Sequence, residues 1–161
     1  MRVGFPAFCF FGSRRSEKIC EGCIDRYNAK MTIRMQLLYA QFIVVALLAI
    51  FHRIAIENNL YWHYMWLDLF AHTLGGMWAG FCVFWIRAKL NLRSNLAWVV
   101  VGALALGVAW ELFEIAAGLP RGANYTLDTS FDVLMDAVGG ILAGLLVWIA
   151  SRTRAKERAG R

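Results

Sequence analysis

Apolar residues lie along this chain in four long runs, separated by short stretches that hold most of the charged residues. Two of the runs contain no Asp, Glu, Lys or Arg, and each of the other two contains only two acidic residues. A hydrocarbon core about 30 Å thick needs about 20 residues of α-helix, and open strands would leave unpaired backbone groups in lipid. The pattern therefore predicts an all-α fold, an integral membrane bundle of four transmembrane helices at residues 35–52, 66–86, 96–117 and 129–150.

The overall composition favours a membrane protein over a soluble one. Hydrophobic residues make up 60% of the 161 residues and charged residues 17%, whereas a soluble domain is closer to half apolar and a quarter charged. The net charge of +6 would suggest nucleic acid in a soluble protein. Here we expect a lipid bilayer and no nucleic acid as the partner. A transmembrane domain at 31–152 is expected between a basic segment, 1–30, and a basic tail, 153–161.

The basic residues alternate along the chain in a way that predicts orientation. Fifteen of the 17 Lys and Arg residues lie before the first predicted helix, in the second connection or after the last helix. The positive-inside rule then places both termini in the cytoplasm, as in a multi-pass protein of the bacterial cytoplasmic (inner) membrane. Aromatic residues mark the outer and then the inner interface: Tyr61, Trp62, Tyr64 and Trp66; Trp85, Trp98 and Trp148.

The segment 1–30 has no clear apolar period. It contains Cys9 and a Cys-x-x-Cys pair, Cys20 and Cys23, a spacing used in zinc and redox sites. A closed zinc site needs four ligands, and the segment offers three cysteines and no histidine. We expect a disordered cytoplasmic tail, or a translation start that truly lies at Met31 or Met35.

The second and fourth predicted helices repeat one pattern at a constant offset of 64 residues. Asp68 aligns with Asp132 and His72 with Asp136, followed by matching Gly-Gly and Ala-Gly pairs. Both helices are predicted to run from outside to inside, so the repeat predicts two helical hairpins related as parallel repeats, as in some transporters. Small residues can coincide by chance in membrane helices, but chance does not explain the aligned acids.

Polar and small residues share one face on each of the last three predicted helices. The glycines on these faces are expected to let the helices pack closely: Gly75, Gly76, Gly80, Gly107, Gly139, Gly140 and Gly144. The ionisable residues form a candidate site that binds a cation or protons and opens toward the outer face: Asp68, His72, Glu111, Glu114, Asp132 and Asp136.

The negative charge of this cluster must be neutralised. A carboxylate at the bilayer centre costs roughly 2.5–3.5 kcal/mol on insertion scales, and no Lys or Arg lies within the four predicted spans. A divalent cation, with the harder Mg²⁺, Ca²⁺ or Mn²⁺ matching the oxygen majority, has these candidate ligands: His72, Asp68, Glu111, Asp132 and Asp136. Structural roles compete with this reading, because Asp128 is predicted to cap the last helix and His72 could simply bond to Asp68.

These residues resemble the motifs of the VanZ-like membrane proteins, and more closely those of their YjdF-type branch. The resemblance rests on three motifs: Asp68-x3-His72-x2-Gly75-Gly76, Trp110-Glu111-x2-Glu114, and Asp128-Thr129-x2-Asp132-x3-Asp136-x2-Gly139. It covers residues 35–150 and implies a small helical bacterial membrane protein whose activity is mostly undefined. Some VanZ-type relatives are linked to glycopeptide resistance at the cell envelope, a link that concerns those relatives.

Three functions remain open from the sequence. The leading one is a binding or transport module in which the cluster binds a cation or protons. The second is a membrane-embedded, metal-dependent enzyme that acts on a lipid-linked phosphate at the outer leaflet by metal-assisted hydrolysis. Two features weigh against an enzyme: no activated Ser or Cys is evident, and the nearest cation that could bind a phosphate is Arg121, in the third connection. The third is a structural envelope protein with no small-molecule site, in which the polar face fixes helix register.

Overall fold

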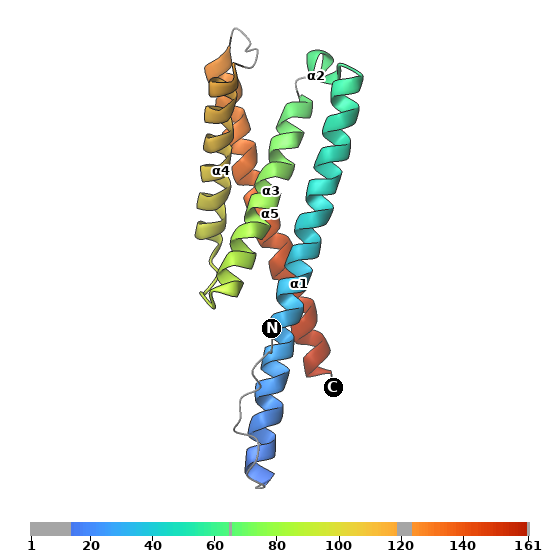
Figure 1. The fold of residues 1–161 in the computed structure, drawn as a ribbon, viewed down its shortest axis with the longest axis vertical. Helices are drawn as coiled ribbons and strands as arrows, with labels where there is room; N and C mark the ends of the chain where they lie inside the picture. The colour runs from blue at the N-terminus through green and yellow to red at the C-terminus, as the bar shows by residue number, and fades with distance from the viewer. Residues whose placement is uncertain (1–13, 65, 119–123, 161) are drawn as a thin grey trace. The chain divides into compact units, whose positions relative to one another are not determined.

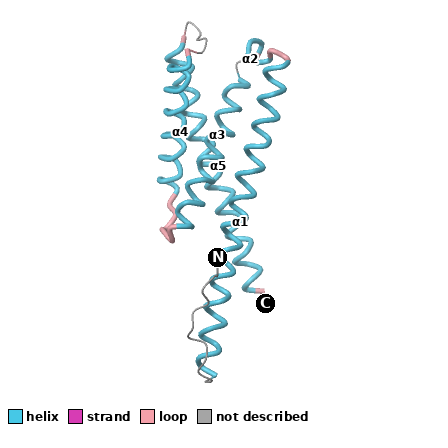
Figure 2. The backbone as a smooth tube through the Cα atoms, viewed as in Figure 1, coloured by secondary structure: helices cyan, strands magenta, loops and turns pink. Residues whose placement is uncertain are grey.

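The computed structural model describes residues 14–64, 66–118 and 124–160, and every regular element in them is an α-helix (Figures 1 and 2). The helices are α1 (Arg14–Glu57), α2 (Leu60–His63), α3 (Trp66–Lys89), α4 (Leu96–Ala117) and α5 (Tyr125–Ala159). Four segments are long and apolar enough to cross a membrane: Lys30–Glu57, Trp66–Lys89, Leu96–Ala117 and Tyr125–Lys156. The predicted all-α fold with four spanning helices is therefore confirmed, and a lipid bilayer is its environment.

The first helix begins earlier than the apolar pattern predicts. α1 starts at Arg14, so residues 14–30, expected to be a disordered tail, are helical, while residues 1–13 lie outside the described part of the chain. Residues 14–30 contain no proline and a single glycine, Gly22, so nothing in them interrupts a helix that continues backward from the span. The chain divides into two compact units, Met1–Gln36 (unit 1) and Leu37–Arg161 (unit 2).

α4 has the predicted boundaries because both of its ends carry capping residues. The side chain of Asn95 accepts a hydrogen bond of 2.5 Å from the backbone N–H of Ala97, which satisfies one of the free donors of the first turn. Gly118 takes the left-handed conformation with φ of 66°, and its N–H returns to the carbonyls of the last turn. Only glycine adopts that conformation without steric cost, so the helix ends there.

α5 begins at Tyr125, four residues before the predicted start at 129. Asp128, predicted to cap this helix, therefore lies inside its first turn, and the capping position belongs to Asn124, whose side chain makes no capping hydrogen bond. An acid in the first turn still interacts favourably with the helix dipole. Asp128 is exposed, and it is not the N-cap.

Within unit 2, α3 and α5 approach until backbone meets backbone. A Cβ atom added to Gly76 would overlap the backbone of Asp136, and one added to Gly139 would overlap the carbonyl of Thr73. Such contacts require glycine, because any side chain would push the two helices apart. Figure 1 shows the α3–α4 connection at one end of unit 2, with α2 and the start of α5 at the other end.

α4 packs against both of these helices. A Cβ atom on Gly140 of α5 would lie 2.9 Å from that of Ala103, and one on Gly80 of α3 would lie 3.1 Å from Cγ1 of Val99. Val99 of α4 is fully buried at the centre of the apolar core. Six of the seven glycines predicted to mediate packing would clash with a neighbouring helix if they carried a side chain: Gly76, Gly80, Gly107, Gly139, Gly140 and Gly144.

α1 contributes to unit 2 through residues 37–57. Leu37 and Val44 are buried in the apolar core. Gln41 donates to the carbonyl of Phe81 (3.4 Å) and accepts from the thiol of Cys82 (3.3 Å). The pattern gave no role to this glutamine. Both hydrogen bonds of its side-chain amide are made to α3. Much of the apolar surface of α1 is exposed, as expected for a helix that faces lipid.

Candidate functional site

Four ionisable side chains are buried where α3, α4 and α5 meet. His72, Glu111, Asp132 and Asp136 are each 9% exposed or less, and they are the buried polar or charged residues of the described part of the chain. Asp68, in the first turn of α3, is half-buried. Five of the six predicted site residues thus lie in or at the rim of one interior region, close to the end of unit 2 that carries α2.

His72 is held on one side by Asp136. Its Nδ1 atom lies 3.2 Å from Oδ2 of Asp136. When the carboxylate of Asp136 accepts this hydrogen bond, Nδ1 is the donor and Nε2 is left on the other side of the ring. Two glycines leave room for the side chain of Asp136. Its carboxylate occupies the space that a side chain on Gly107 would fill, and it lies 3.6 Å from the Cβ position of Gly75.

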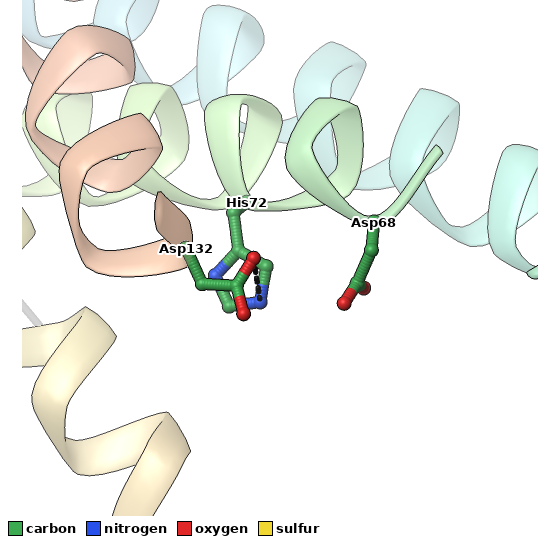
Figure 3. A group of neighbouring side chains, drawn as sticks. All are labelled: Asp68, His72 and Asp132. Carbon is green, nitrogen blue, oxygen red and sulfur yellow. Dashed lines mark ion pairs between the residues drawn. The ribbon is translucent and has the colours of Figure 1, made fainter. Parts of the chain in front are cut away.

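On its other side His72 faces two more carboxylates (Figure 3). Its Nε2 atom lies 4.0 Å from Oδ1 of Asp132, which is too far for a hydrogen bond. Asp132 Oδ1 is buried and has no hydrogen-bond partner. One ligand atom from each of Asp68, His72 and Asp132 lies within 4.8 Å of the others. We call these three residues the Asp–His–Asp triad.

Glu111 lies beside the triad and is tied to α5. Its Oε2 accepts a hydrogen bond of 2.8 Å from the hydroxyl of Thr129, whereas its buried Oε1 has no hydrogen-bond partner. Thr129, one turn before Asp132, was not predicted as a site residue. Its position directly after Asp128, at the start of the last helix, is the feature of the sequence that could have indicated it. Glu114 is placed apart, because it accepts from the indole N–H of Trp110 at 2.9 Å on its own helix.

A second polar pair lies at the rim of the site, on the side of α2. The Nδ1 atom of His52 and the hydroxyl of Tyr61 are 2.9 Å apart, and their rings are 5.7 Å apart. Burial, and secondarily the negative charge of Asp68, raise the pKa of the Tyr61 hydroxyl above its ordinary value. Tyr61 therefore stays protonated near the mouth of the triad. The pattern predicted it only as an interfacial aromatic residue.

The chemistry available to the triad is that of a three-ligand cation site. Two carboxylate oxygens and one imidazole nitrogen suit a divalent ion. Two ligands bound at about 2.1 Å to one tetrahedral ion lie about 3.4 Å apart, so the 4.0 Å between His72 Nε2 and Asp132 Oδ1 is about 0.6 Å wider than such an ion would hold them. Hydrogen bonding of the other imidazole nitrogen to a carboxylate is the usual way to orient a metal-binding histidine. Arg121, the cation on which a phosphate-binding role would depend, lies outside the described residues.

Comparison with known proteins places the chain in a family. Residues 23–153 match the family described as "Predicted membrane protein (DUF2238)". The chain belongs to this DUF2238 family. The predicted YjdF-type branch corresponds to it, while the wider VanZ-like resemblance stays a prediction. The DUF2238 match extends beyond the predicted 35–150 and takes in the residues just before the first span. No curated protein and no solved structure matches the chain.

Proposed function

We propose that this DUF2238 protein binds a divalent transition-metal ion, such as Zn²⁺ or Mn²⁺, at the Asp–His–Asp triad, in a binding or transport role within the membrane. The observation that carries the proposal is the 4.0 Å separation of His72 Nε2 and Asp132 Oδ1. Two buried groups of complementary chemistry face each other there without a hydrogen bond. A buried carboxylate oxygen without a hydrogen-bond partner, as Asp132 Oδ1 is, is costly, and an ion coordinated by both groups would reduce that cost.

The ligand set decides between classes of ion. Imidazole favours Zn²⁺ and its neighbours, while carboxylates also accept Mn²⁺, Mg²⁺ and Ca²⁺. Mg²⁺ needs near-ideal octahedral oxygen ligands and retains several waters, which a buried triad with one nitrogen does not favour. Zn²⁺ and Mn²⁺ therefore fit better than Mg²⁺, which the acidic residues alone also suggested.

The depth of the triad supports access from the membrane surface. Asp68 lies in the first turn of α3 and is half-buried, His72 lies one turn further, and Asp132 lies about two turns into α5. With the orientation that the basic residues predict, the entrance belongs to the outer face. An ion would meet Asp68 first and then the buried pair.

The test is the metal content of the purified full chain. After equilibration with Zn²⁺, Mn²⁺, Mg²⁺ or Ca²⁺ and removal of excess ion, we expect about one Zn²⁺ or Mn²⁺ per chain, as the single triad implies. Asp132→Asn and His72→Gln should each lose it, whereas Asp128→Asn, an exposed acid on the same helix, should retain it. Equal metal content in the wild type and in Asp132→Asn would overturn the proposal.

Uptake into vesicles separates transport from binding. Proteoliposomes that contain the chain and an internal metal-sensitive dye should report Zn²⁺ or Mn²⁺ entry if the site is part of a path. Stoichiometric binding without entry would establish a binding protein instead.

A further inference from the structure

Six basic side chains lie toward the end of unit 2 where α3 passes into α4. They come from the last turn of α3, the connection and the C-terminal part of α5: Arg87, Lys89, Arg93, Arg152, Arg154 and Lys156. Leu96 at the start of α4 lies against Gly144 of α5, and Arg152, Arg154 and Lys156 follow two to three turns further along α5 in the same direction. Residues 82–98 and 146–156 contain no Asp or Glu. We call this group the basic end.

Three of these cations lie over tryptophan rings. The distances from the charged group to the ring centroid are 5.3 Å for Arg87 over Trp98, 5.1 Å for Lys89 over Trp85 and 4.7 Å for Arg152 over Trp148. A cation over an aromatic face is attracted by the ring electrons. Arg87 is held further, because its Nε donates to the carbonyl of Arg93 at 3.0 Å. These three positive groups are therefore held in place by their ring contacts.

The opposite end of unit 2 is built differently. Its aromatic residues pair with one another, as Tyr64 does with Trp66 at 6.4 Å. The arginine described there, Arg53, is paired with Glu57 at 2.6 Å. Tryptophans are common at both membrane interfaces, but among the described residues the tryptophan–cation pairs lie at the basic end. The difference points to a function beyond anchoring.

We propose that the basic end binds the phosphate of anionic phospholipids. Interfacial tryptophans lie at headgroup depth, and juxtamembrane Lys and Arg attract anionic lipid. A guanidinium stacked on a ring keeps its N–H groups in its own plane, where they can donate to phosphate oxygens. Exposed leucines at the same connection, Leu90, Leu92 and Leu96, offer contact to the glycerol and upper acyl chains. An amphiphile fits this surface better than free phosphate does.

The experiment titrates the purified full chain in a neutral detergent with short-chain phosphatidylglycerol and counts bound lipid by native mass spectrometry. We expect phosphatidylglycerol to bind in preference to phosphatidylcholine and to be released by salt, since exposed charges are screened. Each of Arg87→Gln and Arg152→Gln should weaken the binding about fivefold. Arg53→Gln, at the other end, should leave it unchanged. Inorganic phosphate should not compete at the same concentration.

Substitutions of Trp148 test the proposal even if the arginine substitutions alter folding. Trp148→Phe retains an aromatic face under Arg152 and should keep most of the preference, while Trp148→Leu should lose part of it. Melting temperatures of all variants identify any that unfold. Equal binding of the two lipids by the wild type, or an undiminished preference in folded Arg87→Gln and Arg152→Gln, would contradict the proposal. Competition by inorganic phosphate would also contradict it, by showing an anion site without lipid recognition.

Discussion

At the scale of single residues, the sequence pattern identifies the interior ionisable groups well. His72, Glu111, Asp132 and Asp136 interrupt apolar runs, and a charged residue within a span has to face protein and not lipid. The structure buries these four. The pattern does not predict which atoms meet, because neighbouring positions on a helix point about 100° apart and small helix rotations re-pair the side chains. Glu114 shows this, since it turns to Trp110 instead.

The role of Asp136 gives a prediction at this scale. Asp136→Asn keeps an oxygen that accepts from His72 Nδ1 but removes the charge, so His72 stays oriented while its nitrogen ligand becomes less basic. We expect the metal affinity, measured by isothermal titration of the purified chain, to fall about 10–100-fold without being abolished. Asp128→Asn is the matched control on the same helix. Complete loss of binding, as in Asp132→Asn, would show that Asp136 is itself a ligand; unchanged affinity would remove its orienting role.

At the scale of elements, helix boundaries are predictable where capping residues coincide with the membrane border. Asn95 and Gly118 fix α4 at both ends. α1 and α5 instead continue as polar helices beyond the apolar runs, to Arg14 in one case and Ala159 in the other. Hydropathy carries no signal for a helix that has left the bilayer, so it misplaces those boundaries.

The contact between α3 and α5 gives the second prediction. Gly76 and Gly75 are adjacent in sequence, yet a side chain on Gly76 would overlap the backbone of Asp136, whereas one on Gly75 would make an ordinary contact of 3.6 Å. Gly76→Ala should therefore lower the stability of the folded state by roughly 1–3 kcal/mol or more. Gly75→Ala should change it by less than about 1 kcal/mol, since the helix favours alanine.

Reversible unfolding in mixed micelles with increasing SDS measures both variants. A similar loss in Gly75→Ala and Gly76→Ala would show that the glycines matter for general helix flexibility and not for the α3–α5 contact. Metal content measured on the same samples should fall in Gly76→Ala, because its displaced helix carries His72 away from Asp132.

At the scale of the whole molecule, the number of spans and the basic residues around them follow from the sequence. The all-α fold is confirmed because length and hydropathy alone determine it. The position of the polar cluster among three helices depends instead on glycine contacts between residues far apart in the chain, such as Gly139 with Thr73. A pattern along one helix does not specify its partner.

Orientation gives the third prediction. Basic residues occupy the N-terminal segment, the α3–α4 connection and the C-terminal tail, so these parts should lie in the cytoplasm. Reporter fusions at Lys89 and after Arg161 should give cytoplasmic activity, and a fusion at Asn58 should give external activity. A cytoplasmic signal at Asn58 would reverse the side from which ions reach Asp68, although the triad itself would be unaffected.

The contact between His72 and Asp136 has a consequence for how such a site can arise. These residues occupy the same position in the two copies of the repeated pattern and touch each other, although they lie 64 positions apart in the chain. Two identical subunits related by a two-fold axis would place the same residue on both sides of that contact, as either two aspartates that repel or two histidines without an acceptor. Joining both copies in one polypeptide frees each side to mutate separately. A single chain that holds both copies of the pattern can therefore carry an acid on one side of the contact and an imidazole on the other.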